Sequence, residues 1–359
     1  MNRVWSRGIL PAVFAAAMIG AALWRCGGDL RSGLGLSGAK EPMAQTRLSV
    51  WVADWDYKLG AADWASLSGS PESVQLFGAY FDERDKLLFR DDFFKLLEAV
   101  QRPGLPAGGK AGYERYLTIV NDIVKGDATS LLKDSGLVSR LAASESSRKA
   151  HIAAVVAAAK QYGMDGIELD YERVAQADWP NVVRLFGELH RALAAEWLKL
   201  RIVLEPGAPV ERLELPEGPE YVMMAYNLYG THSGPGPKTD LAYIGKLAKR
   251  LEHVPGAPVL AFATGGFDWD AAGKATALME TDAIRLAQAA GVQPQRDEAS
   301  GSLYFTYTDW QGAEHTVWYA DAATLQGWID AAKQRGVTRA AIWRMGGLSK
   351  ASLDYLGSL

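Results

Sequence analysis

The chain is poor in the residues on which disulfide and metal chemistry depend. Its 359 residues include one cysteine, Cys26, and five histidines. A single thiol excludes an internal disulfide, so the fold must be stabilised by its packed core. The histidines form no H-x-x-x-H pair and no cluster with cysteine, and the sequence therefore predicts no metal site. No P-loop and no Gly-x-Ser-x-Gly elbow occurs either, and we expect no cofactor.

A strong excess of either charge is also missing. The net charge is −4 and the pI is about 5.8, which argues against a nucleic-acid-binding surface. Apolar residues make up 48% of the chain and charged residues 22%, a balance typical of a globular protein with a sizeable core. Aromatic residues, in contrast, are plentiful, with 12 Trp and 14 Tyr. Most should pack in the core, but flat aromatic faces also suit a carbohydrate partner.

The N-terminal segment differs in composition from the rest of the chain. A basic start leads into a short apolar run, Ile9–Trp24, which predicts an export signal and leaves a retained membrane anchor open. Cys26 suggests a lipid anchor, whereas Arg25 before it is not the small residue that lipoprotein processing requires. Residues 1–26 are thus predicted to be a signal peptide or anchor, and the Gly- and Ser-rich residues 27–46 a linker. We expect an exported protein that is periplasmic, extracellular or anchored to the outer side of the membrane.

Residues 47–359 show a regular alternation of short apolar runs and helix-period segments. There are eight such runs: LSVWVADW (48), VQLFGAYF (74), RYLTIVND (115), GIELDY (166), RIVLEP (201), YVMMAY (221), PVLAFAT (258) and RAAIWRM (339). Continuous apolar runs indicate strands buried on both faces, as in parallel sheets. Eight strand–helix units predict an α/β fold, a (β/α)8 TIM barrel with active groups at the carboxyl ends of its strands. A doubly wound open sheet is the alternative, although no Gly-rich loop follows the first strand.

One segment, from about residue 269 to 320, interrupts this rhythm between the seventh and eighth runs. It contains GSLYFTYTDWQGAEHTVWYAD (301–321), two alternating β-rich stretches around a turn-like DWQG. This pattern predicts a β-hairpin within a small α+β insertion. An insertion at this place would form a wall on one side of the active-site groove.

The fourth run, extended as GIELDYE, is unusually acidic for a buried strand. Because strand side chains alternate, Glu168, Asp170 and Glu172 should share one face and point to the barrel axis, with Glu172 nearest the mouth. Clustered carboxylates raise one another's pKa, which predicts a glutamic acid that remains protonated near neutral pH and acts as a general acid. The alternative is that arginine or lysine side chains neutralise these carboxylates inside the barrel.

The shared direction of these acids also limits the mechanism. Most glycosidases place two carboxylates on opposite sides of the scissile bond. Two acids on one strand cannot do so, and the nucleophile must come from elsewhere. A 2-acetamido group on the substrate can supply it, with Glu172 protonating the leaving oxygen and Asp170 orienting the acetamide.

DGIELDYE resembles the D-x-x-D-x-D-x-E signature of glycoside hydrolase family 18, the chitinases and related N-acetylglucosaminidases. The resemblance implies substrate-assisted retaining chemistry, with Glu172 as acid/base, Asp170 as the acetamide-orienting carboxylate and Asp165 as a supporting residue. One departure from the signature is Glu168, which stands where the family usually has Asp and could alter proton sharing with Asp170. Tyr171 stands where many members have Trp.

Two further segments are similar to the same family. MAYN (224–227) is similar to M-x-Y-D, which implies that Tyr226 donates its hydroxyl to the acetamide oxygen and that Asn227 replaces an Asp. AIWRMGG (341–347) resembles the terminal strand, whose Trp343 would floor the sugar subsite. The hairpin segment resembles the insertion of the bacterial spore-cortex and germination-type branch.

The expected substrate is a β-1,4-linked N-acetylglucosamine glycan, from chitin or peptidoglycan, bound by a monomer. The residues expected to contact it are Glu168, Asp165, Asn227, Trp343, Trp51 and Trp55. Asn121, Asp122 and Glu205 end neighbouring strands and are further groove candidates. The sequence does not decide between exo and endo action. A non-hydrolytic glycan-binding barrel is the alternative function, and turnover would distinguish the two.

Overall fold

A computed structural model describes residues 45–69, 71–100, 112–127 and 129–359. The predicted signal or anchor, and nearly all of the predicted linker, lie outside these residues. Within the described ranges, no helix has the length and apolar character needed to cross a membrane.

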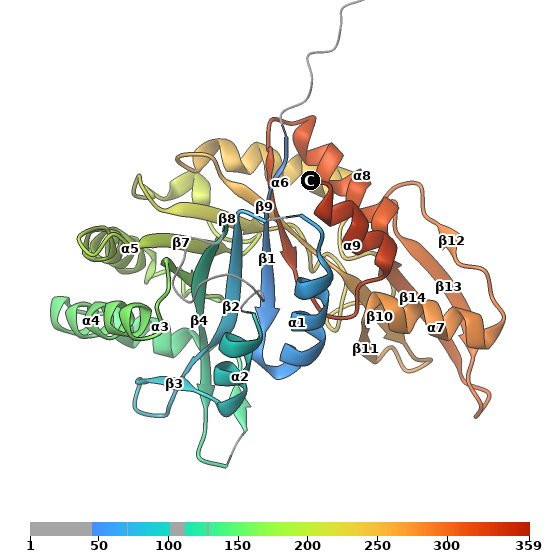
Figure 1. Cartoon of the computed structure of the whole chain (residues 1–359), viewed down its shortest axis with the longest axis horizontal. Coiled ribbons are helices and arrows are strands. Elements are labelled where there is room, and N and C mark those ends of the chain that lie inside the picture. The colour runs from blue at the N-terminus through green and yellow to red at the C-terminus, as the bar shows by residue number, and fades with distance from the viewer. Residues whose placement is uncertain (1–44, 70, 101–111, 128) are drawn as a thin grey trace, which may run out of the picture. The chain divides into compact units, whose positions relative to one another are not determined.

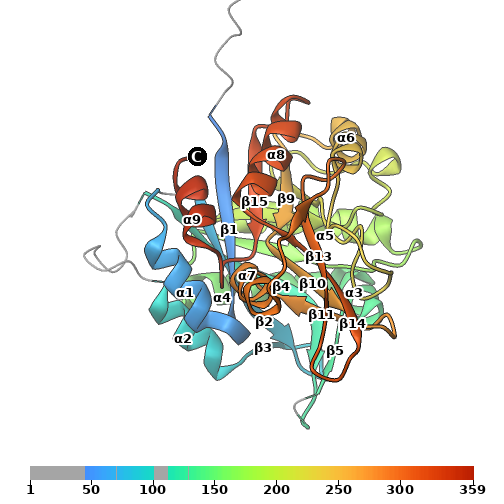
Figure 2. The same ribbon diagram turned by 90° about the vertical axis from the view of Figure 1, so that its right-hand side faces the viewer.

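Eight parallel strands form a closed barrel (Figures 1 and 2). They are β1 (Arg47–Ala53), β2 (Ser73–Phe81), β4 (Glu114–Val124), β6 (Gly166–Asp170), β7 (Lys199–Leu204), β8 (Glu220–Met224), β9 (Val259–Ala263) and β15 (Arg339–Trp343). Each strand pairs with the next, and β15 closes the ring by pairing in parallel with β1. The TIM-barrel prediction is confirmed, and all eight predicted runs are barrel strands. The open-sheet alternative is excluded by the β1–β15 pairing.

Helices surround the barrel, and short elements extend its edges. The helices are α1 (Tyr57–Ser66), α2 (Asp91–Ala99), α3 (Ser135–Ala142), α4 (Glu145–Gln161), α5 (Trp179–Ala194), α6 (Leu241–Arg250), α8 (Ala322–Lys333) and α9 (Lys350–Gly357), with 3₁₀ turns η1 (Asp54–Asp56), η2 (Val210–Arg212) and η3 (Leu251–His253). The short strands β3 (Leu87–Phe89) and β5 (Ser130–Leu131) pair antiparallel with β2 and β4. Side-chain caps fix several helix starts; Ser144, for example, caps α4 in a capping box with Ser147.

The side chains of the strands alternate between two cores. Outward-facing residues such as Ile167 and Leu169 pack against the helices in the larger core. Inward-facing residues fill the barrel in a second cluster, which includes Val120, Val203, Val222, Ala261 and Ala341. This alternation leaves the inward positions near the strand ends for polar and aromatic groups.

The insertion follows β9 directly and forms a five-stranded antiparallel sheet beside the barrel, drawn in orange in Figure 1. Its elements are β10 (Gly265–Trp269), β11 (Ala275–Leu278), α7 (Glu280–Ala290), β12 (Gln295–Arg296), β13 (Leu303–Thr308) and β14 (Glu314–Ala320). The predicted hairpin is β13–β14, and the carboxylate of Asp309 accepts hydrogen bonds from two backbone N–H groups of its turn. The sheet begins at Gly265, four residues before the predicted start of the insertion.

Candidate active site

The predicted carboxylate pair lies at the carboxyl end of β6. Asp170 is the last residue of the strand and is buried, while Glu172 lies two residues further and retains 18% exposure of its side chain. The intervening Tyr171 packs outward into the helical layer, where its hydroxyl bonds His151. The alternation along this segment therefore turns both acids inward, with Glu172 nearer to solvent.

Glu168 is not part of this pair. Its side chain is fully buried and accepts hydrogen bonds from Trp51 Nε1 (2.5 Å), Thr118 Oγ1 (2.8 Å) and Arg201 Nε (2.9 Å). Arg201 is itself buried and also pairs with Glu220. The expectation that Glu168 contacts substrate is wrong, because Arg201 neutralises it beneath the site. For Glu168, the alternative of neutralisation by an arginine inside the barrel holds.

Lys133 supplies the cation that the other two acids share. Its Nζ lies 2.6 Å from Glu172 Oε1 and 3.5 Å from Asp170 Oδ2. The other oxygen of Asp170, Oδ1, is buried and has no hydrogen-bond partner among the described residues. Burial raises the pKa of Asp170 to about 7; Lys133 opposes this rise, and the charges of Glu172 and Glu168 add to it. We predicted a protonated glutamic acid, whereas burial favours a protonated Asp170.

The end of β4 holds both Glu172 and Lys133 through the backbone. Asn121 Nδ2 donates to the carbonyl of Glu172 (2.9 Å), and its Oδ1 accepts from the N–H of Glu172 (3.0 Å). Asp122 Oδ1 accepts from the N–H of Lys133 (2.8 Å), whose φ is +55°. Asn121 and Asp122, which were candidates for lining the groove, thus position the charged residues. Glu205, after β7, accepts from the N–H of Arg173 (2.6 Å).

Tyr226 follows β8 and belongs to the barrel-interior cluster. Burial raises the pKa of its hydroxyl well above the ordinary value, and the charges of Asp170, Glu172 and Glu168 raise it further. The hydroxyl is therefore a neutral donor close to the acidic pair. Asn227, the next residue, is exposed and has φ of +66°, a left-handed conformation that asparagine tolerates.

Aromatic rings line the mouth beside these acids. Trp343, at the end of β15, is half-buried, with its ring centroid 5.1 Å from that of Phe77 and 6.2 Å from that of Trp55. Trp55 is 47% exposed and can meet a ligand. Trp51 is only 2% exposed and packs edge-on against Trp343 at 5.9 Å. Trp51 thus supports Trp343 and Glu168 from inside the barrel. This burial corrects the prediction that Trp51 contacts substrate.

Asp165 lies at the opposite end of the strand from Glu172. It is exposed, and its Oδ2 accepts a hydrogen bond from the N–H of Arg115 (2.9 Å), which joins the start of β6 to β4. Seven residues of extended chain span about 23 Å. This position corrects the prediction that Asp165 contacts substrate, and agrees with a supporting role.

Several charged residues of the mouth were not predicted. Lys133 is the main one. Arg90, ion-paired with buried Asp54 (3.3 Å), and Arg344, ion-paired with Asp56 (2.6 Å), are two more. The acidic strand signals that a buried cation is needed. It does not indicate which lysine or arginine supplies that cation, because Lys133 lies in a loop with no distinctive pattern.

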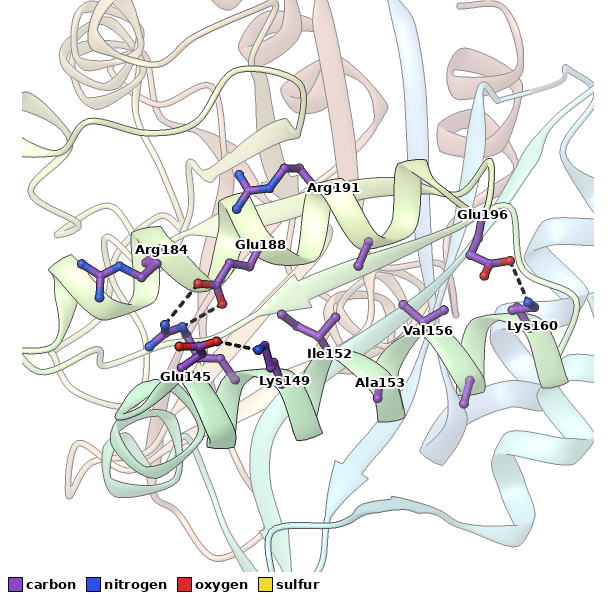
Figure 3. Close-up of a pocket in the computed structure, with 13 residues that line it drawn as sticks. Glu145, Lys149, Ile152, Ala153, Val156, Lys160, Arg184, Glu188, Arg191 and Glu196 are labelled. Atoms are coloured by element: carbon purple, nitrogen blue, oxygen red, sulfur yellow. Dashed lines mark hydrogen bonds and ion pairs between the residues drawn. The ribbon is translucent and has the colours of Figure 1, made fainter.

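A separate groove of about 1090 Å³ runs between α4 and α5 on the outside of the barrel (Figure 3). Its floor includes Ile152 and Val156, and ion pairs such as Lys160–Glu196 border it. None of the residues at the strand ends lines this groove. We therefore assign it no part in the chemistry of the mouth.

Comparison with known proteins bears on this site. A family model described as glycosyl hydrolases family 18 matches residues 129–347, more than half of the chain. The matched region contains Lys133, Asp170, Glu172, Tyr226 and Trp343.

The individual proteins to which the chain is similar share less than a quarter of their aligned residues with it. The chain is 23% identical over 237 residues to the uncharacterized glycosylase YvbX of Bacillus subtilis (strain 168), covering 60% of this chain and 67% of YvbX. It spans about half the length of the cortical fragment-lytic enzymes of Bacillus anthracis and Bacillus cereus that it matches. Its fold is similar to that of the spore cortex-lytic enzyme SleL of Bacillus cereus (TM-score 0.72, 17% identity, 88% of this chain and 74% of SleL). A chitinase of Chromobacterium violaceum is also similar in fold (TM-score 0.71, 20% identity, 87% of this chain and 98% of that chain).

Proposed function

Because the chain belongs to glycosyl hydrolases family 18 and is a glycoside hydrolase, we propose that it cleaves β-1,4-linked N-acetylglucosamine glycans with retention at the anomeric carbon. The observation that carries this proposal is the pairing of Asp170 and Glu172 on one side of the mouth through Lys133. Similar proteins that are named as a chitinase, a cortical fragment-lytic enzyme and a spore cortex-lytic enzyme support this substrate class. The substrate would be either chitin oligomers or peptidoglycan.

The direction of the two carboxylates favours substrate-assisted catalysis. Both come from one strand segment, so neither can attack the far face of a sugar that the other protonates. The acetamido oxygen of the substrate attacks the anomeric carbon while Glu172 gives its proton to the leaving glycosidic oxygen. Asp170 accepts a hydrogen bond from the acetamide N–H as positive charge develops on the acetamide. Water then loses a proton to Glu172 and opens the cyclic intermediate, which restores the starting configuration.

The aromatic and hydroxyl groups complete this assignment. The buried Tyr226 hydroxyl is neutral and suited to donate to the acetamide oxygen. Trp343 would stack under the sugar at the cleavage point, with exposed Trp55 extending the floor. Asn227 would bind a sugar hydroxyl from the rim of the mouth.

The first test is hydrolysis of fluorogenic chitobioside and chitotrioside, and of purified peptidoglycan glycan strands, by the full chain and by Glu172→Gln. Removal of the general acid should lower kcat by about 10²–10⁴-fold while oligosaccharide binding remains. Glu252→Gln is the control, because Glu252 is exposed and lies in η3, which leads into the amino end of β9.

The results separate the candidate functions. Turnover lost only in Glu172→Gln supports the glycosidase, and the preferred substrate identifies the glycan. Binding without turnover by the wild-type chain on every substrate would instead establish a non-hydrolytic glycan-binding barrel. Equal activity of wild type and Glu172→Gln would exclude Glu172 as the acid.

We also propose that the protein is a monomer and works outside the cytoplasm, either free or anchored to the outer side of the membrane by residues 1–26. The basic and apolar pattern of this segment supports export. Mass spectrometry of the N-terminus of the mature protein, together with cell fractionation, tests the location. Light scattering of the purified protein tests the monomer.

A further inference from the structure

Lys133 occupies a distinctive place in the candidate site. Its side chain is only 18% exposed, and its Nζ lies 5.6 Å from the centre of the Phe77 ring as well as against Glu172 and Asp170. The loop that carries it is fixed by the Asp122 hydrogen bond to its N–H. The lysine is therefore held at the catalytic pair by the fold.

The surroundings of Lys133 are predominantly acidic. Besides Asp170 at the end of β6 and Glu172 after it, Lys133 faces Asp122 from β4 and Glu205 after β7. Tyr226, which follows β8, borders the same acids. The other cations described near these groups are engaged elsewhere or exposed. Arg201 is bonded to Glu168 and Glu220, and the side chain of Arg173 lies on the exposed surface. Lys133 is thus the buried cation that balances the acidic pair.

The ion pair between Glu168 and Arg201 limits where the proton of the Asp170–Glu172 pair can move. Both oxygens of Glu168 are already occupied, by Trp51 and Thr118 on one side and by the buried guanidinium of Arg201 on the other. Asp170 therefore exchanges its proton with Glu172 rather than with Glu168. In the structure, Lys133 lies closer to Glu172 (2.6 Å) than to Asp170 (3.5 Å), and burial favours a neutral Asp170. Catalysis requires the reverse distribution, with the proton on Glu172.

We propose that Lys133 is a positioning residue that moves its ion pair from Glu172 to Asp170 when substrate enters, so that the proton passes from Asp170 to Glu172. The Asp170 O–H bond breaks and a Glu172 O–H bond forms, with no net gain of protons or charge. Asp170 then carries the negative charge, which is stabilised by Lys133, already 3.5 Å away, and by the acetamide N–H. This role rests on the proposed function.

The first test compares wild type with Lys133→Met and Lys133→Arg, using the pH profile of kcat/KM on the glycan that the wild type hydrolyses. Met keeps the length of the side chain and removes its charge, and both variants meet the same positive φ. Lys133 lowers the pKa of Asp170, so loss of the cation should raise this pKa and move the limb of the profile that it sets upward by about one to three pH units. Lys133→Arg keeps the positive charge, so its profile should lie close to that of wild type. An unmoved profile with a uniformly lower kcat would reduce Lys133 to a structural role.

A second test needs no turnover. In protein labelled with ¹³C at the aspartate carboxyls, the Asp170 resonance is identified by its loss in Asp170→Asn. Its titration midpoint should be near pH 7 in wild type and higher in folded Lys133→Met. An unchanged midpoint would overturn the proposal. If the wild type hydrolyses no N-acetylglucosamine glycan, the proposed function fails, while this titration still decides how Lys133 and Asp170 are coupled.

Discussion

Asp170 is a residue whose environment favours its neutral form. Burial is the main cause of its raised pKa, since one carboxylate oxygen is enclosed without a hydrogen-bond partner among the described residues. In the unfolded chain the same carboxyl ionises near its ordinary pKa of 3.8. Between these two values the folded chain binds more protons than the unfolded chain, so this group makes the protein less stable as pH rises.

Asp170→Asn should therefore gain stability over wild type as pH rises from about 4 to 7. Asn has the same shape and stays neutral, so it avoids the cost of burying a charge. We expect the difference in Tm, variant minus wild type, to increase by a few degrees across this range. Thermal melts followed by circular dichroism at several pH values measure it.

Asp127→Asn provides a control of opposite sign. Hydrogen bonds from Thr129 to the exposed Asp127 carboxylate lower its pKa, so the charged form adds stability above the ordinary pKa. The Tm of Asp127→Asn, relative to that of wild type, should therefore fall as pH rises. A Tm difference for Asp170→Asn that does not change with pH would mean that burial does not raise this pKa.

The sequence indicated the placement of the two candidate acids better than it indicated their partners. The acidic signature predicted the inward placement of Asp170 and Glu172, and the family inferred from it is confirmed. It did not predict the Arg201–Glu168 and Lys133–Glu172 ion pairs, because each joins residues distant in sequence. Strand periodicity gives the face of a residue, but not which cation of another element meets it there.

At the scale of elements, the insertion depends on close backbone contact at Gly266. This residue of β10 pairs with Tyr319 of β14, and a Cβ added to it would lie 1.8 Å from the carbonyl oxygen of Trp318. No side chain larger than hydrogen fits unless the two strands separate. The wall beside the mouth therefore requires glycine at this position.

Gly266→Ala should destabilise the insertion by about 1–3 kcal/mol or more. The loss should appear in thermal melts and in altered tryptophan fluorescence, because Trp318 lies in the disturbed pair of strands. Gly327→Ala is the matched control, since Gly327 faces solvent in α8 with no atom within 4 Å of its added Cβ. Alanine there should add about 0.5–1 kcal/mol of stability. Equal effects of the two substitutions would contradict the packing argument.

The larger elements were predictable because their patterns are local. All eight barrel strands follow from apolar runs, and the β13–β14 hairpin follows from its turn residues. The full insertion sheet was not predicted. Its β10 strand, GGFDW, is rich in glycine and lacks the continuous apolar run that identified the others.

At the scale of the whole molecule, the barrel brings the two ends of its chain together. β1 pairs with β15, and Gln45 Nε2 donates to the carbonyl of Leu359 at 3.0 Å. The C-terminus accordingly lies near the start of β1 in both views (Figures 1 and 2). A short linker can therefore join residues 359 and 45 without distorting the barrel.

We expect a circular permutant of residues 45–359 to fold when it is opened between Trp310 and Gln311, at the tip of the β13–β14 hairpin. Trp310 is 90% exposed, so new ends there disturb little packing. Its circular dichroism spectrum should match that of the unpermuted chain, with Tm within a few degrees. A permutant opened between Leu169 and Asp170, inside buried β6, should not fold. Failure of the first permutant, or folding of the second, would contradict this view of the barrel.

The same β1–β15 pairing has a consequence for the order of synthesis. Arg47 pairs in register with Arg339, and a ribosome takes about 15–60 s to translate the residues between them at ordinary rates. During that interval one edge of β1 has no partner, and the ring cannot close. If the chain is exported while it is still being synthesised, it crosses the membrane before its last strand is available. Closure of the barrel would then take place in the compartment where the enzyme works.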